Sequence, residues 1–161
     1  MKKFIVTLLV SLLVLSSVGC GKKSTGTIEG SLSTIMDEII DTVDVDDETK
    51  EYVLDRLNKA EVPDDQKEYF FGTTDIEYEE AFSAEPLINA QAFSLVLVKA
   101  KDADAANKLK ESLLTTVNPN KWICVSVDES QVKTSAVGNI VLLVMAENAE
   151  KYISAFEALA K

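Results

Sequence analysis

The sequence predicts an α+β domain: an antiparallel sheet of about four strands with helices packed on one face, preceded by further helices. Three observations predict this class. Residues 92–98 and 140–145 are almost wholly apolar and rich in Val, Ile and Leu, which is typical of buried strands. Residues 32–43 instead carry apolar side chains at helical spacing, with acidic residues between them. The predicted elements of the second half follow the order β-α-β-β-β-α, which favours antiparallel strands with packed helices.

The first half of the domain is predicted to be helical. One amphipathic helix spans residues 31–43, and a second begins at Asp46 or Asp47 and reaches about Lys59. Residues 63–72 form a short third helix, which Pro63 opens and Gly72 ends.

Two segments follow with weaker signals. Residues 76–82 fit an edge strand or a helical turn, and a strand is favoured. Residues 83–86 are predicted to be a turn, because Glu85 precedes a proline and is pushed out of the helical region.

The remaining elements have clearer boundaries. Asp102 is predicted to cap a helix, Asn118-Pro119-Asn120 to end it, and Asn148 to cap the last helix. Gly138-Asn139 is a tight-turn signal between two strands. The predicted spans are a helix over 103–117, strands over 122–127, 131–137 and 140–145, and a closing helix after 148.

The first 20 residues have the pattern of a lipoprotein signal. Two lysines precede an apolar run of about a dozen residues, shorter than the roughly 20 that a spanning helix needs. A Val-Gly-Cys sequence ending at Cys20 fits a lipobox, although Ser17 stands where the strict pattern has Leu. We expect a diacylglyceryl anchor on Cys20 that holds the chain on the extracytoplasmic face of the cell membrane. A signal cleaved elsewhere, or an uncleaved anchor, is the alternative.

This signal divides the chain into three parts. Residues 1–19 are the predicted signal peptide, and residues 20–30 are the lipidated Cys and a flexible tether. Residues 31–161 are predicted to form a single α+β domain, with a helical part over 31–72 and a sheet-containing part over 73–161.

Composition excludes several classes of function. Without residues 1–19 the chain has 14 basic and 27 acidic residues, a net charge of −13, so we expect no nucleic-acid partner. The chain has no histidine, which excludes Ser-His-Asp and Cys-His catalysis and His-ligated zinc. The acidic run 44–48 lacks the glycine of a calcium loop, because Thr49 stands in its place. We therefore predict neither a metal nor a cofactor.

Lys121, Trp122 and Glu85 are the candidate ligand-binding residues. A tryptophan beside a lysine and near the predicted turn with Glu85 suits an anionic or amphipathic ligand, whereas a Trp in the core is the alternative. Cys124 is the only candidate nucleophile, but in the middle of a predicted strand it is expected to be a buried, inert thiol. Glu77 and Glu79 share one face of a possible strand, where a solvated edge is favoured over a glycosidase pair.

Several stretches carry a resemblance to a known family. They run in family order across roughly residues 64–160, and the Trp-Ile-Cys-Val block is the most specific: Phe71–Thr74, Ser83–Leu87, Phe93–Val98, Asn118–Val125 and Gly138–Met145. In them the chain resembles an uncharacterised family of Gram-positive lipoproteins that is known as a domain of unknown function. The resemblance implies a small α+β lipoprotein on the cell surface and brings no catalytic residues.

The sequence therefore predicts a lipid-anchored extracellular protein rather than an enzyme. We expect a binding or accessory module that recognises an envelope protein or a small ligand. A structural spacer of the cell envelope is the alternative, and a hydrolase that uses acidic residues is a weaker one.

Overall fold

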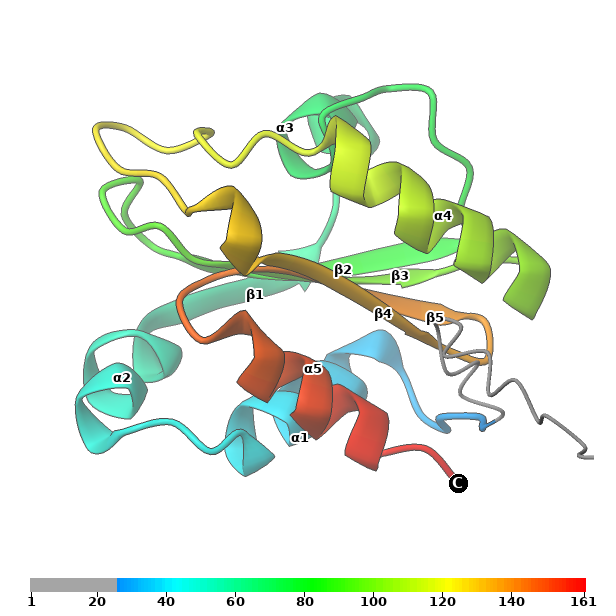
Figure 1. The fold of residues 1–161 in the computed structure, drawn as a ribbon, viewed down its shortest axis with the longest axis horizontal. Helices are drawn as coiled ribbons and strands as arrows, with labels where there is room; N and C mark the ends of the chain where they lie inside the picture. Colours follow the sequence, from blue (N-terminus) through cyan, green and yellow to red (C-terminus); the bar gives the residue numbers. More distant parts are fainter. Residues whose placement is uncertain (1–25) are drawn as a thin grey trace, which may run out of the picture.

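A five-stranded antiparallel sheet forms the middle layer of the fold, and helices cover both of its faces (Figure 1). The computed structural model describes residues 26–161, so the predicted signal, Cys20 and the first part of the tether lie outside the described residues. Every neighbouring pair of strands is antiparallel, which confirms the predicted α+β class. The spatial order is β1-β2-β3-β5-β4, with these bounds: β1 (Leu57–Glu61), β2 (Glu80–Pro86), β3 (Ser94–Lys99), β4 (Val132–Val137) and β5 (Ile140–Met145).

Helices lie on both faces of the sheet, with α2 on the same side as α1 and α5 (Figure 1). On one face α1 contacts β2 and β3, and α5 contacts β4 and β5; on the other, α4 packs on β4 and β5 beside α3. The helices are α1 (Leu32–Thr42), α2 (Asp47–Tyr52), α3 (Lys67–Phe71), α4 (Ala103–Thr116) and α5 (Ala149–Ala158), with single 3-10 turns at Leu54–Arg56, Asp64–Gln66 and Glu129–Gln131. Within residues 26–161 no helix is long and apolar enough to cross a membrane.

The prediction that the helices pack on one face is wrong, because the central strands are buried on both sides. All six residues of β5 are buried, as are all residues of β3 except Lys99. An antiparallel strand with one solvated face alternates apolar and polar residues, whereas β5 and residues 95–98 of β3 are continuous apolar runs. A second layer of helices therefore covers the second face.

Each face has its own apolar core. Between the sheet and α1 and α5, the buried Ile35 and Phe156 lie near Phe93 and Tyr152, whose rings meet edge to face at 5.6 Å. Between the sheet and α3 and α4 lies the second core, which includes Leu113. Each fully buried side chain of this size contributes about 1.5–3 kcal/mol, so both layers of helices are held mainly by these contacts.

Side chains cap three helix starts, and two of these caps, Asp46 and Asp102, were predicted from the sequence. The side chains of Ser31, Asp46 and Asp102 accept hydrogen bonds from backbone N–H groups three residues later, at 3.2, 2.8 and 2.7 Å. Asn148 also stands at a helix start, but its backbone is left-handed (φ 59°) and its side chain caps nothing. Gln131 takes this role, because its Oε1 accepts from the Ala149 N–H at 3.2 Å.

The segments before β3 differ from the prediction. The second helix ends at Tyr52 and not at about Lys59 as predicted, and residues 57–61 form the edge strand β1. Residues 83–86 continue β2 rather than turning, because the extended backbone required before a proline also suits a strand. The proline itself is the last residue of β2, where the ladder ends.

The predicted strand over 122–127 is an irregular loop. Cys124 has a left-handed backbone (φ 62°), which breaks an extended chain. The backbone groups here bond outside the sheet: the Ile123 N–H donates to the Asn89 carbonyl oxygen of another loop at 2.9 Å, and the Val127 N–H donates to that of Pro119 in the same loop at 3.0 Å. The alternation of apolar residues here therefore does not correspond to a strand in the sheet.

Gly72 ends α3 with φ of 69° and lies against the end of α4. A Cβ here would come 1.7 Å from the Thr116 carbonyl oxygen, which cannot give way. We expect Gly72→Ala to lower the free energy of unfolding by more than about 4 kcal/mol, because the clash adds to backbone strain. Urea unfolding measures this loss.

Gly30→Ala is the matched control for this substitution. Gly30 also has positive φ (118°), but an added Cβ would meet no atom closer than 3.8 Å. The control therefore carries backbone strain without a clash. An equal loss of stability in the two variants would contradict the contact between α3 and α4.

Candidate functional site

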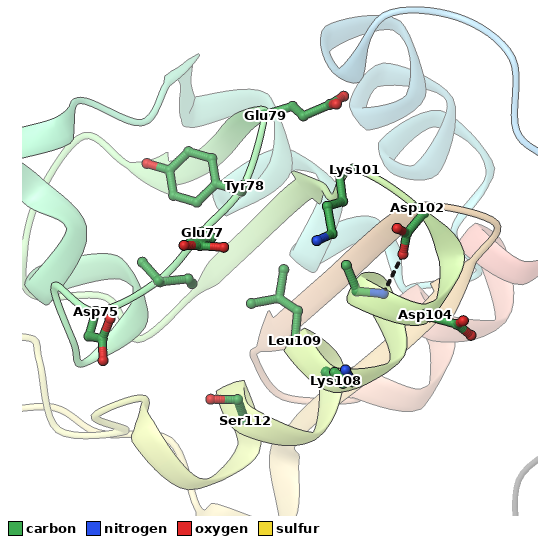
Figure 2. Close-up of a pocket in the computed structure, with 12 residues that line it drawn as sticks. Asp75, Glu77, Tyr78, Glu79, Lys101, Asp102, Asp104, Lys108, Leu109 and Ser112 are labelled. Atoms are coloured by element: carbon green, nitrogen blue, oxygen red, sulfur yellow. Dashed lines mark hydrogen bonds between the residues drawn. The ribbon is translucent and has the colours of Figure 1, made fainter.

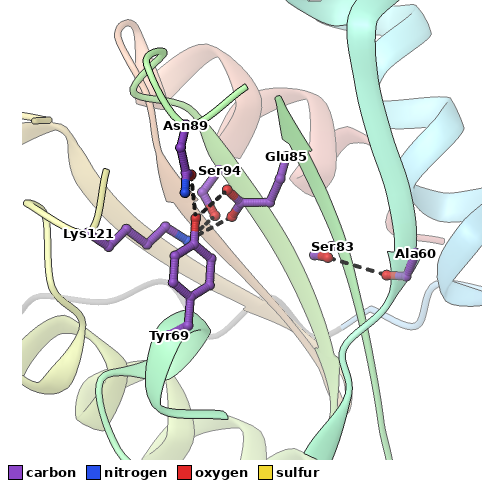
Figure 3. A network of polar contacts seen from close by, with 7 residues as sticks. All are labelled: Ala60, Tyr69, Ser83, Glu85, Asn89, Ser94 and Lys121. Carbon is purple, nitrogen blue, oxygen red and sulfur yellow. Dashed lines mark hydrogen bonds and ion pairs between the residues drawn. The ribbon is translucent and has the colours of Figure 1, made fainter. Parts of the chain in front are cut away.

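A buried ion pair forms the centre of the candidate site (Figure 3). The Lys121 Nζ lies 2.7 Å from Oε1 of Glu85, and the two side chains are only 3% and 12% exposed. The same ammonium group donates to the Ser94 hydroxyl at 3.1 Å. The charge of Lys121 is thus neutralised inside the protein.

Aromatic rings surround the ammonium group. The ring centres of Tyr69, Phe70 and Trp122 lie 4.4, 5.0 and 5.2 Å from Lys121 Nζ, within the range of cation–π attraction. Burial lowers the pKa of Lys121, and the neighbouring Glu85 opposes that change. The rings and the carboxylate together replace the water that a lysine would otherwise keep.

The Tyr69 hydroxyl connects the ion pair to the surface. It lies 3.4 Å from Oε2 of Glu85 and 3.3 Å from Oδ1 of Asn89, so its single proton is shared between two acceptors. Burial, and then the negative charge of Glu85, raise the pKa of Tyr69 to about 12. Tyr69 is therefore a neutral donor at physiological pH.

Four separate segments bring these side chains together. Glu85 lies on β2 and Ser94 opens β3, one residue beyond the paired Ala84 and Leu95. Alternation along β2 directs Glu85 to the face of α3 and α4. Tyr69 comes from α3, and Lys121 comes from the loop that follows α4.

A groove of about 530 Å³ lies beside this cluster, between α3 and the strands β1 and β2 at one side of the sheet. Tyr69 and Phe70 provide aromatic surface, and the other walls offer both hydrogen-bond donors and acceptors. The polar side chains include Asn58, Gln66, Tyr69, Ser83, Glu85 and Asn89. Such a lining suits a polar ligand that brings donors and acceptors of its own.

A second hollow of about 610 Å³ separates residues 75–79 from the start of α4 (Figure 2). Glu77 and Glu79 point into solvent here from an irregular segment before β2, and Glu79 lies 3.8 Å from Lys99. Asp102 already caps α4. Among the described residues no group of three or more carboxylates or thiols could hold a metal ion.

The structure brings the three predicted ligand-binding residues together, but in other roles. Lys121 was expected to face a ligand, whereas its ammonium group forms an ion pair with the carboxylate of Glu85 inside the protein. Trp122 is buried beside it, and its indole N–H has no hydrogen-bond partner among residues 26–161. The prediction that Cys124 is buried in a strand is wrong: the thiol is exposed on a loop.

Sequence reasoning missed Tyr69, Asn89 and Ser94. Tyr69 and Ser94 each lie in an element that was predicted, but no local signal relates them to Glu85 or Lys121. Their proximity follows only from strand register and from the course of the loop after α4.

The contact between Ser94 and Lys121 has the composition of a serine–lysine pair, but it does not present a nucleophile. Ser94 is fully buried, so no substrate reaches its hydroxyl. Lys121 donates to both of its partners, whereas a general base must accept a proton. The cluster can hold the groove in shape and offer polar contacts at its wall.

No family model matches the chain, and no curated protein or solved structure matches it either. The resemblance to a lipoprotein family therefore stays a prediction from the sequence.

Removal of either member of the buried pair should destabilise the domain strongly. We expect Glu85→Gln or Lys121→Met to cost about 3–5 kcal/mol each, because each leaves an unpaired buried group. The double variant should cost much less than the sum, which a double-mutant cycle measured by urea unfolding will show.

The surface pair Lys161–Glu29, with exposures of 73% and 78%, is the control. Substitutions there should cost less than about 1 kcal/mol. Additive losses at Glu85 and Lys121 would contradict the described pairing.

Proposed function

We propose that the chain is a lipid-anchored protein of the extracytoplasmic membrane face, and that its domain is a non-catalytic binding module. The groove between α3 and the edge of the sheet is its binding site. The observation that carries this proposal is the groove itself, whose polar lining is held by a buried ion pair and three aromatic rings. Such a wall is already ordered before a ligand arrives, which lowers the cost of binding.

The position of the chain ends supports this arrangement. Thr27 and Lys161 exchange backbone hydrogen bonds of 3.4 and 3.1 Å, and Gly26 lies beside the turn at Gly138. This turn is at one end of β5, whereas Ser94, which binds Lys121, pairs with Met145 at the other end. Six residues of strand separate the two ends by roughly 20 Å. A domain anchored through Cys20 therefore presents the site away from the membrane.

Two alternatives receive less support. A spacer needs only a closed, charged surface. This domain instead has a groove, and the loops beside it expose apolar side chains. A hydrolase that uses acidic residues needs two carboxyl groups in a dry cleft. Glu77 and Glu79 are exposed, and Glu85 is the partner of Lys121 in the ion pair.

The anchor is tested by Cys20→Ser in a host that makes bacterial lipoproteins. We expect the variant to leave the membrane fraction and intact mass to show no acyl chains, because the thiol is the attachment point. Cys124→Ser is the matched control and should stay in the membrane fraction with its lipid. A Cys20→Ser protein that remains membrane-bound and lipidated would contradict the anchor.

The binding role is tested with dipeptides and short saccharides as probes. Trp122 is the only tryptophan and contacts the ion pair, so its fluorescence should report binding. Asn58→Ala and Gln66→Ala should each weaken binding about fivefold, as the loss of one hydrogen bond predicts. Lys108→Ala in the second hollow should leave binding unchanged. If no probe binds, or if only Lys108→Ala affects binding, the groove is not the site.

A further inference from the structure

The strand β1 has an open edge beside the groove. It is the first strand of the sheet, and among residues 26–161 it pairs with β2 alone. The N–H of Val62, directly after β1, donates to the Ala81 carbonyl oxygen at 2.9 Å. Because the direction of backbone groups alternates along a strand, those of Lys59 and Glu61 point away from β2. The outer edge of β1 therefore offers donors and acceptors at strand spacing.

The usual protection of a strand edge is weak at this site. A lysine on an edge strand keeps other strands away when its ammonium group stands free at that edge. Here the Lys59 ammonium is paired with Asp37 on α1, below the sheet. Asn58 and Ala60 face the groove instead.

An exposed apolar patch lies at one end of the groove. It comprises Leu87, Ile88, Ile123 and Val125, whose side chains are 74%, 66%, 65% and 36% exposed. The two loops that carry it are joined by the hydrogen bond from Ile123 to the Asn89 carbonyl oxygen. Loops of a monomeric domain rarely expose four large apolar side chains together without a partner for them.

The groove and the patch are continuous. Pro86 and Asn89 line the groove, and Leu87 and Ile88 lie between them in the sequence. Leu57 of β1 pairs with Pro86, so the start of β1 is the end nearest the patch. A segment extended along β1 would cover the groove and then reach the patch.

We propose that this surface binds an extended segment of a partner protein, which adds to the edge of β1 as a further strand and lays apolar side chains on the patch. This inference rests on the proposed binding role and identifies the ligand class of the same groove. Only another polypeptide backbone matches the alternating groups at the edge of β1. The net charge of −13 without residues 1–19 favours a neutral or basic segment over a second copy of this acidic chain.

A bilayer is a poorer occupant of the patch. The patch lies at the end of the sheet opposite Gly26, where the described chain begins. An acidic domain is also repelled by anionic lipids.

The test uses the lipidated chain in nanodiscs and a phage library of random twelve-residue peptides as the probe. We expect the enriched peptides to be neutral or basic, with apolar residues near one end. Lys59→Pro should weaken an enriched peptide at least about tenfold, because it removes one outward N–H and places a ring at the edge. Lys59→Ala loses the same ion pair with Asp37 but keeps the N–H, so its affinity should stay within about twofold.

A second pair of variants and a second measurement keep the test independent of folding. Leu87→Ser with Ile88→Ser, both at exposed positions, should also weaken the peptide at least about tenfold. In the wild-type chain, hydrogen exchange should show that the bound peptide protects the amides of Lys59 and Glu61.

Peptides that bind Lys59→Pro and Lys59→Ala equally and leave both amides unprotected would overturn strand addition. So would a selection that enriches no peptide while dipeptides or saccharides still bind in dependence on Asn58 and Gln66. In that second case the proposed binding role stands and only the extended partner segment is wrong. If no probe of any kind binds, both proposals fail.

Discussion

Two adjacent strands that are apolar on both faces set the architecture of this domain. β3 and β5 pair along their whole length, and all of their side chains except that of Lys99 are buried. A sheet with such a centre is unstable in water unless both faces are covered, so α1 and α5 pack on one face and α3 and α4 on the other. Strands with partly polar residues, β1 and β4, are left at the edges.

The ion pair of Lys121 and Glu85 is the polar exception inside this apolar frame. Burying two charges costs solvation, and their mutual attraction seldom yields a net gain over apolar residues of similar size. The ion pair is better explained by its effect on the position of a loop than by a gain in stability. The loop after α4 has no regular secondary structure up to residue 128, and Lys121 joins it to β2 and β3. We infer that the pair holds this loop in one position, and with it Ile123 and Val125.

Local signals predicted the elements that local interactions determine. The caps at Ser31, Asp46 and Asp102 lie in the sequence beside the helices they begin, and the apolar runs of β3 and β5 are strands by composition alone. β1 could not be found in this way, because its sequence, LNKAE, has no apolar alternation and its pairing with β2 is a tertiary contact. The prediction of a strand over residues 122–127 was wrong for the opposite reason. Apolar and polar residues alternate there, but no strand among the described residues pairs with them.

The sequence predicted three residues of the candidate site, but it gave the wrong structural reason for their proximity. Lys121, Trp122 and Glu85 were grouped through an expected turn, whereas Glu85 is in fact placed by the register of β2 against β3. The contribution of Tyr69 depends on how α3 sits against the sheet, which Gly72 and the end of α4 determine. Information of this kind is spread over the whole fold and has no short sequence signature.

The pairing of Thr27 with Lys161 fixes the start of the domain at one end of the strands, and this has a mechanical consequence. If the tether is fixed in a membrane and a partner grips the opposite end, tension between them runs nearly parallel to the strands. Ladder bonds between antiparallel strands lie perpendicular to that direction, so they are strained in shear and many must fail at once. A domain loaded in this direction withstands pulling far better than one whose strands are peeled apart singly.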